Sequence, residues 1–219
     1  MNLIATGIKS RFEELKQSVS GVHEWTWSDN LSETKLELFD AIFDLGFDDN
    51  NQDLAPYANL KGKPVFVSTV KSGLAGPVKN YGEPLQCLLT GLNCQTGFIQ
   101  RELKEVSIID FENKSEIENF AQQLGWKLQW VDDRVGMVTP RIVYMIINEA
   151  YYTLQEGTAT ATDIDLGMKL GTNYPMGPFE WLKKVGAKDV YETLLALYND
   201  TQEERYKICP LLKKEYLRD

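Results

Sequence analysis

Cysteine is scarce in this chain of 219 residues, and the few that occur form no recognisable pattern. The three cysteines are odd in number and include no C-x-x-C pair, so they predict neither a disulfide framework nor a zinc site. They are Cys87, Cys94 and Cys209. The acidic pairs Asp48-Asp49 and Asp132-Asp133 have no histidine or further carboxylate at ligand spacing, so we expect no bound metal.

Long hydrophobic runs and positive charge are also lacking. No apolar run approaches the ~18 residues of a membrane-spanning helix, and the first residues do not resemble a signal peptide, so we expect a cytoplasmic protein. The chain has 23 Lys and Arg against 32 Asp and Glu, and residues 1–133 hold most of the acidic excess. This charge repels nucleic acid, although helix N-termini and backbone amides can still bind a nucleotide cofactor locally.

Residues 1–133 alternate short apolar runs with patterns typical of helices. This alternation predicts an α/β domain with a mostly parallel sheet and helices on its faces. We expect strands at residues 3–6, 24–27, 39–45, 64–70, 86–91, 103–109 and 127–131. We expect helices at residues 11–19, 31–38, 54–60 and 114–124.

From about Val135 the apolar residues recur with helical spacing only, so residues 134–219 are expected to form an all-α domain. Thr162 is expected to cap one helix of this domain and Gly171 to end it. Pro178 fits the first position of the next helix, because proline has no N–H to leave unpaired there.

The segment from Asp163 to Trp181, with Tyr-Pro-Met-Gly-Pro-Phe-Glu over residues 174–180, is the most specific motif in the chain. Together with Asn148-Glu149-Ala150, it resembles the C-terminal domain of the 3-hydroxyacyl-CoA dehydrogenases. The resemblance covers roughly residues 60 to 200. It implies a shortened, Rossmann-like first domain, a helical domain that forms a homodimer, and an acyl-CoA pocket.

The family reaction moves a hydride between NAD and C3 of the acyl chain. A His acts as acid and base, a Glu orients it, and a Ser and an Asn hold the thioester and the reacting oxygen. By resemblance, the Glu is retained as Glu105, whereas the His, Ser and Asn positions are occupied by Asn93, Val70 and Pro140. Asparagine does not titrate in the physiological range, so Asn93 cannot shuttle the proton that this reaction requires.

The cofactor motif is depleted as well. A dinucleotide turn has the pattern G-x-G-x-x-G, but residues 6–11 read Thr-Gly-Ile-Lys-Ser-Arg, with one glycine. Gly7 is therefore the single candidate for contact with NAD, which the resemblance implies as cofactor. Glu24 and Asp29 are the acidic candidates for holding its ribose. Side chains at the other two glycine positions obstruct close approach of the pyrophosphate.

Each candidate also has a structural interpretation, which we favour in every case. Glu105 is expected to be a solvated or ion-paired residue at a strand end, and Asn93 a loop residue rather than a donor to a substrate carbonyl. Gly7 is expected to lie in an ordinary strand-to-helix turn. Cys94 is expected to be a buried apolar residue, because no base nearby would generate its thiolate.

Two functions follow from these observations. In the first, the chain is a homologue of the family that has lost NAD-dependent hydride transfer and keeps a binding or structural role, with acyl-CoA or another small molecule as ligand. In the alternative, it is an active oxidoreductase on a 3-hydroxyacyl-CoA or a related hydroxy acid, with a rearranged site around Glu105. The simultaneous loss of several positioned groups favours the first function.

Overall fold

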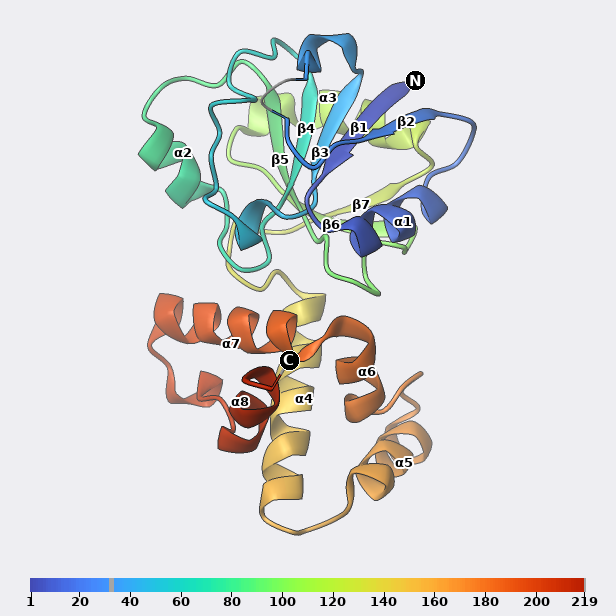
Figure 1. Cartoon of the computed structure of the whole chain (residues 1–219), viewed down its shortest axis with the longest axis vertical. Coiled ribbons are helices and arrows are strands. Elements are labelled where there is room, and N and C mark those ends of the chain that lie inside the picture. Colours follow the sequence, from blue (N-terminus) through green and yellow to red (C-terminus); the bar gives the residue numbers. More distant parts are fainter. Residues whose placement is uncertain (32–33, 219) are drawn as a thin grey trace. The chain divides into compact units, whose positions relative to one another are not determined.

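The structure, a computed structural model, describes residues 1–31 and 34–218 (Figure 1). It divides into two compact units, Met1–Met137 and Val138–Asp219. The sequence places the change of pattern slightly earlier, after Asp133. Each unit has its own core and is described by itself.

The first unit is built on one seven-stranded sheet, in the order β2-β1-β3-β4-β5-β6-β7. All neighbouring strands run parallel except β5 and β6, which are antiparallel. This confirms the mostly parallel sheet, and each expected strand is present. The strands are β1 (Asn2–Thr6), β2 (Glu24–Trp27), β3 (Ala41–Asp44), β4 (Pro64–Ser68), β5 (Leu88–Leu92), β6 (Leu103–Ser107) and β7 (Lys127–Trp130).

The helices of this unit differ more from the expectation. They are α1 (Lys9–Gln17), α2 (Ala75–Tyr81) and α3 (Lys114–Gln123), with 3-10 turns η1 (Leu36–Leu38), η2 (Phe47–Asp49) and η3 (Phe111–Asn113). Helix α2 was not expected, and the helix expected at residues 54–60 is wrong, because that segment forms successive turns that include Pro56. The helix expected at 31–38 falls partly on residues 32–33, outside the described residues.

Side chains alternate between the two faces of the sheet, and both faces are buried. On one face, Leu3 and Phe43 pack in a cluster with Phe12 of α1 and Phe120 of α3. On the other face, the apolar residues of β1, β3 and β4 meet the 3-10 turns η1 and η2, the segment 54–60 and the start of α2. A parallel sheet requires this cover on both faces. Here the second face is covered mainly by turns.

Gly7 lies in the turn between β1 and α1, at the carboxyl end of β1. Its φ of +95° is a conformation that L side chains rarely adopt, and a Cβ there would overlap the backbone nitrogen of Gly46. The missing side chain therefore allows the main chain after β3 to pack directly against the β1–α1 turn. This contact fixes the carboxyl ends of β1 and β3 against each other.

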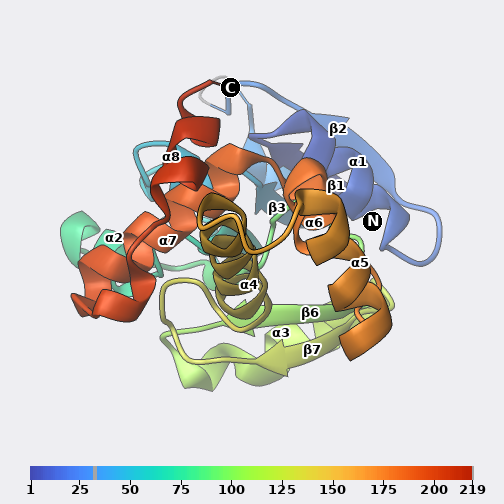
Figure 2. The ribbon, with the colours of Figure 1, turned by 90° about the horizontal axis from the view of Figure 1, so that it is seen from below.

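The second unit is all-helical, as the sequence predicts. Its long helix α4 (Thr139–Gln155) packs against α6 (Pro178–Val185), α7 (Ala187–Thr201) and α8 (Pro210–Tyr216), and Figure 2 shows α4 among them. Helix α5 (Ala161–Thr172) contacts α4 and α6, and the 3-10 turn η4 (Glu204–Tyr206) precedes α8. No helix in the described part of the chain is both long and apolar enough to cross a membrane.

The segment Asp163 to Trp181 holds α5 and α6 together through polar contacts. The Asp165 carboxylate accepts a hydrogen bond from the Phe179 backbone N–H at 2.8 Å. Glu180 accepts from the Gly177 N–H at 2.9 Å and from Lys169 Nζ at 2.5 Å. Asp165, Lys169 and Glu180 therefore have a structural role, which is to hold the two helices and the turn between them in place.

Two expected helix ends in this motif are wrong by one or two residues. Thr160, not Thr162, caps α5, because its hydroxyl accepts from the Asp163 N–H at 3.2 Å. The helix continues through Gly171 to Thr172, and Asn173 ends it with a φ of 56°. Asparagine tolerates this left-handed conformation, so it provides the C-terminal cap that we expected from glycine. Pro178 opens α6 as predicted.

We expect Gly7→Ala to destabilise the first unit by more than about 2 kcal/mol, because it adds both backbone strain and a clash with main chain. Gly62→Ala is the matched control. Gly62 also has a positive φ, of +66°, but nothing lies within 4 Å of an added Cβ, so strain alone should cost about 1 kcal/mol. Urea unfolding measures both, and equal losses would contradict the proposed packing role of Gly7.

Candidate functional site

The structure brings Asn93 and Glu105 together across the antiparallel strands β5 and β6. The register pairs Gly91 with Ser107 and Leu92 with Val106, so the next pair outward is Asn93 and Glu105. The Asn93 N–H donates to the Glu105 carbonyl oxygen at 3.0 Å, and Asn93 Nδ2 lies 3.5 Å from Glu105 Oε2. Asn93 and Glu105, which are twelve residues apart in the sequence, thus lie side by side in the sheet.

Both members of this pair are buried. Asn93 is 5% exposed and Glu105 is 6% exposed. Of the two environments expected for Glu105, solvated or ion-paired, the solvated one is therefore wrong, and Glu105 lies in the middle of β6 rather than at a strand end. Asn93 Oδ1 also accepts from the Gln95 N–H at 3.2 Å, which closes a turn just after β5. The charge of Glu105 also acts on Arg101, because it opposes the burial that lowers the pKa of that guanidinium. Arg101 was not recognised from the sequence.

The other two aligned positions lie in different units. Val70 follows β4, is fully buried, and its carbonyl oxygen accepts from the Gly136 N–H at 2.6 Å. Pro140 lies in the first turn of α4, in the second unit. Neither side chain carries a hydrogen-bonding group.

The turn after β1 does not fit the pyrophosphate of a dinucleotide. Its second and third glycine positions carry Lys9 and Phe12. Lys9 Nζ lies over the rings of Phe12 and Trp27, at 4.9 and 4.5 Å from their centroids. Phe12, on α1, is buried and packs against Trp25 and Trp27 of β2. A lysine side chain therefore stands where a dinucleotide turn needs a close backbone approach, and a phenylalanine where it needs close helix–strand packing.

The carboxyl ends of β1, β3 and β4 are closed by a buried ionic cluster. Arg11 Nη1 donates to the Leu45 carbonyl oxygen at 2.7 Å and to Asp49 Oδ2 at 3.1 Å, with its side chain fully buried. Lys71 Nζ lies 2.6 Å from Asp49 Oδ1. Burial raises the pKa of the neighbouring Asp48, while the Arg11 charge opposes this shift. The cations at this edge of the sheet are therefore engaged with the protein itself.

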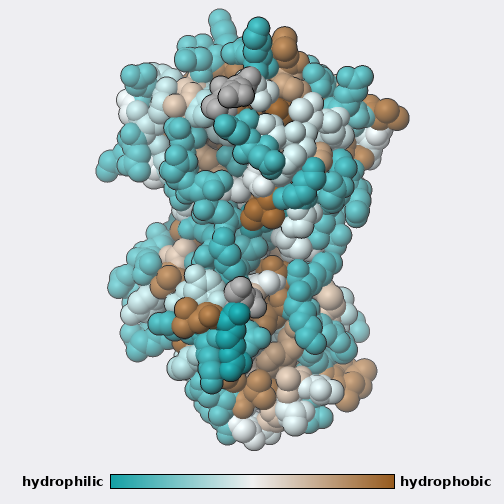
Figure 3. Space-filling view, viewed as in Figure 1, coloured by the Kyte–Doolittle hydropathy of each residue, from teal (hydrophilic) through white to brown (hydrophobic). Residues whose placement is uncertain are grey.

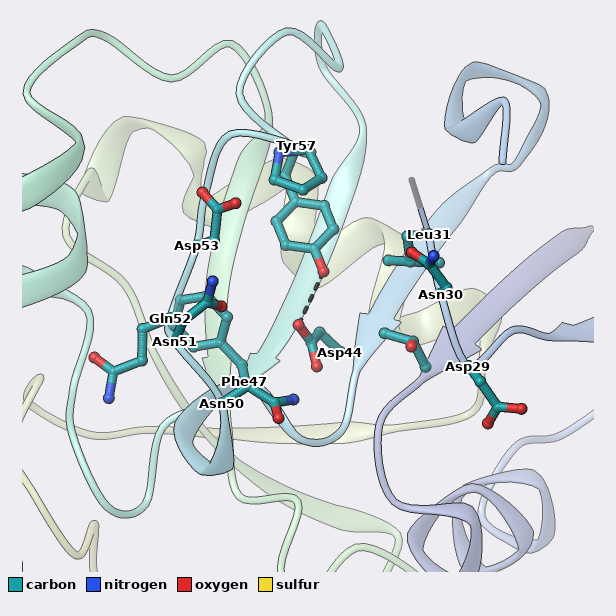
Figure 4. A pocket seen from close by; sticks show the side chains of 12 residues that line it. Asp29, Asn30, Leu31, Asp44, Phe47, Asn50, Asn51, Gln52, Asp53 and Tyr57 are labelled. Atoms are coloured by element: carbon teal, nitrogen blue, oxygen red, sulfur yellow. Dashed lines mark hydrogen bonds between the residues drawn. The ribbon is translucent and has the colours of Figure 1, made fainter. Parts of the chain in front are cut away.

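A cavity of about 490 Å³ opens beside this cluster, between residues 29–31 and residues 50–57 (Figure 4). It is lined by Thr6 and Asp44, the last residues of β1 and β3, and by carboxylates, amides and rings from the two segments. The further lining residues are Asp29, Asn30, Leu31, Phe47, Asn50, Asn51, Gln52, Asp53, Pro56 and Tyr57.

Asp44 and Tyr57 form a buried hydrogen-bonded pair in this cavity. The Tyr57 hydroxyl donates to Asp44 Oδ2 at 2.9 Å, and the Gly46 N–H donates to Asp44 Oδ1 at 3.1 Å. Burial raises the pKa of Asp44 despite these two hydrogen bonds, and burial together with the Asp44 charge raises the pKa of Tyr57. Sequence reasoning missed this pair. The one hint of this pair in the sequence was the group of acidic residues at the end of the predicted strand at 39–45.

The remaining sequence candidates separate clearly in the structure. Asp29 lines the cavity and accepts from Trp27 Nε1 at 3.0 Å, whereas Glu24 is the exposed first residue of β2. Gly7 directly follows the lining residue Thr6 in the sequence, but it does not itself line the cavity. Cys94 is confirmed as buried, and burial raises the pKa of its thiol.

The sequence comparisons point to one family. Residues 136–217 match the family described as 3-hydroxyacyl-CoA dehydrogenase, C-terminal domain. The chain is 42% identical over 98 residues to the 3-hydroxyadipyl-CoA dehydrogenase of Escherichia coli, covering 45% of this chain and 21% of that protein. It is 35% identical over 97 residues to the 3-hydroxybutyryl-CoA dehydrogenase of Bradyrhizobium diazoefficiens, covering 44% and 33%. The match thus spans about a fifth to a third of these curated relatives.

Solved structures extend the likeness of the fold to nearly the whole chain. The crystal structure of M. tuberculosis FadB2 superposes with a TM-score of 0.78, covering 97% of this chain and 92% of that one. The sequence identity is 16%, so this likeness concerns the fold alone.

Lys104, next to Glu105 on β6, is an almost fully buried lysine. Its Nζ donates to Ser18 Oγ at 2.7 Å and to the Ile99 carbonyl oxygen, and lies 4.7 Å from the Trp126 ring centroid. Burial lowers the pKa of Lys104 from 10.5 to about 7. The folded protein therefore releases this proton at a lower pH than the unfolded chain does.

We expect the contribution of Lys104 to the free energy of unfolding to rise with pH above about 7, because there the unfolded state binds more protons at Lys104 than the folded state. Below pH 7 both states are protonated and the contribution is constant. Relative to Lys104→Met, the stability of the unmodified chain should rise by up to about 1.4 kcal/mol per pH unit between pH 7 and 9. Urea unfolding measures this, with exposed Lys61→Met as control. If the stability of the unmodified chain and that of Lys104→Met changed equally with pH, the lowered pKa of Lys104 would be contradicted.

Proposed function

Since this chain belongs to the 3-hydroxyacyl-CoA dehydrogenase family, we propose that it keeps the family fold for a binding or structural role and has lost NAD-dependent hydride transfer. The natural ligands of such a role are acyl-CoA or another small molecule. The three free cysteines are compatible with the reducing cytoplasm in which we place the protein.

The buried pair of Asn93 and Glu105 carries this proposal. By the resemblance it corresponds to the family His and Glu, and the two side chains lie 3.5 Å apart. Hydride transfer at a hydroxyl-bearing carbon must be accompanied by loss or gain of the hydroxyl proton. An amide neither releases nor accepts a proton at neutral pH, and both polar atoms of the Asn93 side chain already contact the protein. The pair can position groups but cannot exchange a proton through Asn93.

The cofactor end gives independent support. Lys9 and Phe12 stand at the second and third glycine positions of the β1–α1 turn, and the nearby cations Arg11 and Lys71 are paired with Asp49. NAD binding in the family manner is therefore not part of the proposed function. No step of a reaction is assigned to the cofactor.

The alternative is an active oxidoreductase with a rearranged site around Glu105. One observation favours it: Glu105 remains buried, within electrostatic reach of Arg101, rather than replaced or exposed. A buried carboxylate beside an amide is a reasonable general base in principle. A measurement of NAD-dependent substrate turnover distinguishes the two functions.

We expect no NADH to form when the 219-residue chain is mixed with NAD and 3-hydroxybutyryl-CoA, as followed by absorbance at 340 nm. Asn93→His restores the acid–base side chain beside Glu105 but not the cofactor turn, so it should remain inactive as well. Turnover by the unmodified chain would contradict the proposed loss. If that turnover disappeared in Glu105→Gln, the rearranged site of the alternative would be established.

We also propose that the chain is a homodimer through α5. This helix has no buried residue, although five of its twelve residues are apolar. Leu166 and Leu170 are 51% and 78% exposed and lie one turn apart on one face. Gly167 and Gly171 leave open space beside them, which permits a close helix approach. Figure 3 shows hydrophobic side chains at the surface over α5.

Leu170→Glu should convert the dimer to a monomer, because it would bury a charge at the centre of the proposed helix contact. Leu217→Glu is the matched control, since Leu217 is 69% exposed but follows α8. Sedimentation velocity should show a dimer for the control and a monomer for Leu170→Glu. A monomer for the unmodified chain at every concentration would contradict the proposal.

A further inference from the structure

We propose that a second cavity, between α2 and the turn that follows β6, binds a small neutral aromatic molecule of one or two rings. The volume of this cavity is about 270 Å³. It is lined by Leu74, Val78, Glu83, Pro84, Leu85, Cys87, Leu89, Ile109, Asp110 and Asn113. The inference goes beyond the proposed function, because it concerns a different site and does not depend on the loss of hydride transfer.

This cavity is separate from the sites described above. Its lining residue Leu89 lies near the start of β5, whereas Asn93 follows the end of that strand, about 13 Å further along. None of its described lining residues also lines the cavity beside Asp44 and Tyr57. A ligand in the second cavity therefore occupies none of the positions that the family resemblance assigns.

The floor of the second cavity is part of the hydrophobic core. Leu74 and Cys87 are 0% and 4% exposed, and they belong to the cluster on the second face of the sheet. Val78 of α2 and Leu85 pack against this cluster but are only partly buried, and Ile109 is 43% exposed. Three separate segments of the chain thus present apolar side chains to one space. A ligand with an apolar surface would remove them from water, which is favourable.

The polar side chains of the lining do not select a charged ligand. Asp110 Oδ1 accepts from the Glu112 N–H at 3.1 Å, and Asp110 Oδ2 accepts from Asn113 Nδ2 at 3.2 Å. Glu83 is exposed, so water screens its attraction for a cation. None of the described lining residues is Lys, Arg or His, so an anion would meet carboxylates without a compensating charge. The cavity therefore favours a neutral molecule that is held by apolar contacts.

The size of the cavity and the thiol in its lining favour an aromatic ring. An apolar cavity of about 150 Å³ accommodates benzene, so about 270 Å³ admits a molecule of one or two rings. Sulfur makes favourable contacts with aromatic rings, and Cys87 lines the cavity. Burial raises the pKa of this thiol to about 11, so the sulfur is uncharged at neutral pH.

Isothermal titration calorimetry of the 219-residue chain with indole tests the proposal. Val78→Trp should fill the cavity, because Val78 lines it from α2. Val22→Trp is the matched control, since Val22 is 97% exposed and does not line the cavity. Ile109→Ser removes apolar area at an exposed position, where it should not impair folding. Thermal unfolding verifies that each variant is folded.

We expect saturable binding of indole at one site. Val78→Trp should weaken it at least about tenfold, Ile109→Ser at least about threefold, and Val22→Trp less than about twofold. Indole-3-acetate, which adds a negative charge, should bind at least about tenfold more weakly than indole, and tryptamine, which adds a positive charge, should bind no more tightly. Equal affinity for indole in folded Val78→Trp and Ile109→Ser would overturn the proposal, as would preferred binding of either charged compound.

Cys87 provides a second measurement at the cavity itself. Cys94 and Cys209 are fully buried, whereas Cys87 is 4% exposed, so iodoacetamide should modify Cys87 first in the folded chain. Saturating indole should slow this modification at least about threefold, as measured by peptide mass spectrometry. An unchanged rate would mean that indole binds elsewhere and would overturn the proposal. Turnover with NAD would contradict the proposed function but would leave both binding results unchanged.

Discussion

The first unit depends most on the contacts that the buried Arg11 guanidinium makes with the main chain and with Asp49. It reaches from α1 to the Leu45 carbonyl oxygen and to Asp49, beyond the end of β3. A fully buried charge is tolerated only when it is paired and hydrogen-bonded, because its transfer from water is otherwise very costly. Arg11 and Asp49 therefore fix α1 and the segment after β3 in one arrangement. The Gly7–Gly46 contact makes the same connection through the main chain.

The contacts of Arg11 and Gly7 at the carboxyl ends of β1 and β3 explain which groups are left to form a site there. At the edge of the sheet where a Rossmann-like fold offers amides and glycines to a dinucleotide, this chain has Lys9, Phe12 and a buried ion pair. The space that remains lies to one side, is acidic, and is organised by Asp44 and Tyr57. Further along the strand order, on β5 and β6, Asn93 and Glu105 lie side by side at the positions that the resemblance assigns to the family His and Glu. Both features occur within an intact fold, whose sheet order and helical second unit are retained.

How much was predictable differs between the fold and the site. The strands were predictable because buried strands in a parallel sheet are short, continuous apolar runs, as at Val65–Val67. The segment at 54–60 has helical spacing of Leu54, Tyr57 and Leu60, yet these residues pack on the sheet from successive turns. Apolar spacing reports which side chains are buried, and turns that contain Pro56 satisfy the same spacing without a helix.

The sequence by itself determined the fold class, the helical second unit and the identity of the residues at the family positions. These follow from local patterns and from the motif at 163–181, whose polar groups bond to one another over short separations. The tertiary structure alone decided that Glu105 is buried, that Arg11 meets Asp49, and that Tyr57 meets Asp44. Such contacts join different elements, and their geometry depends on strand order and register, which no local pattern encodes.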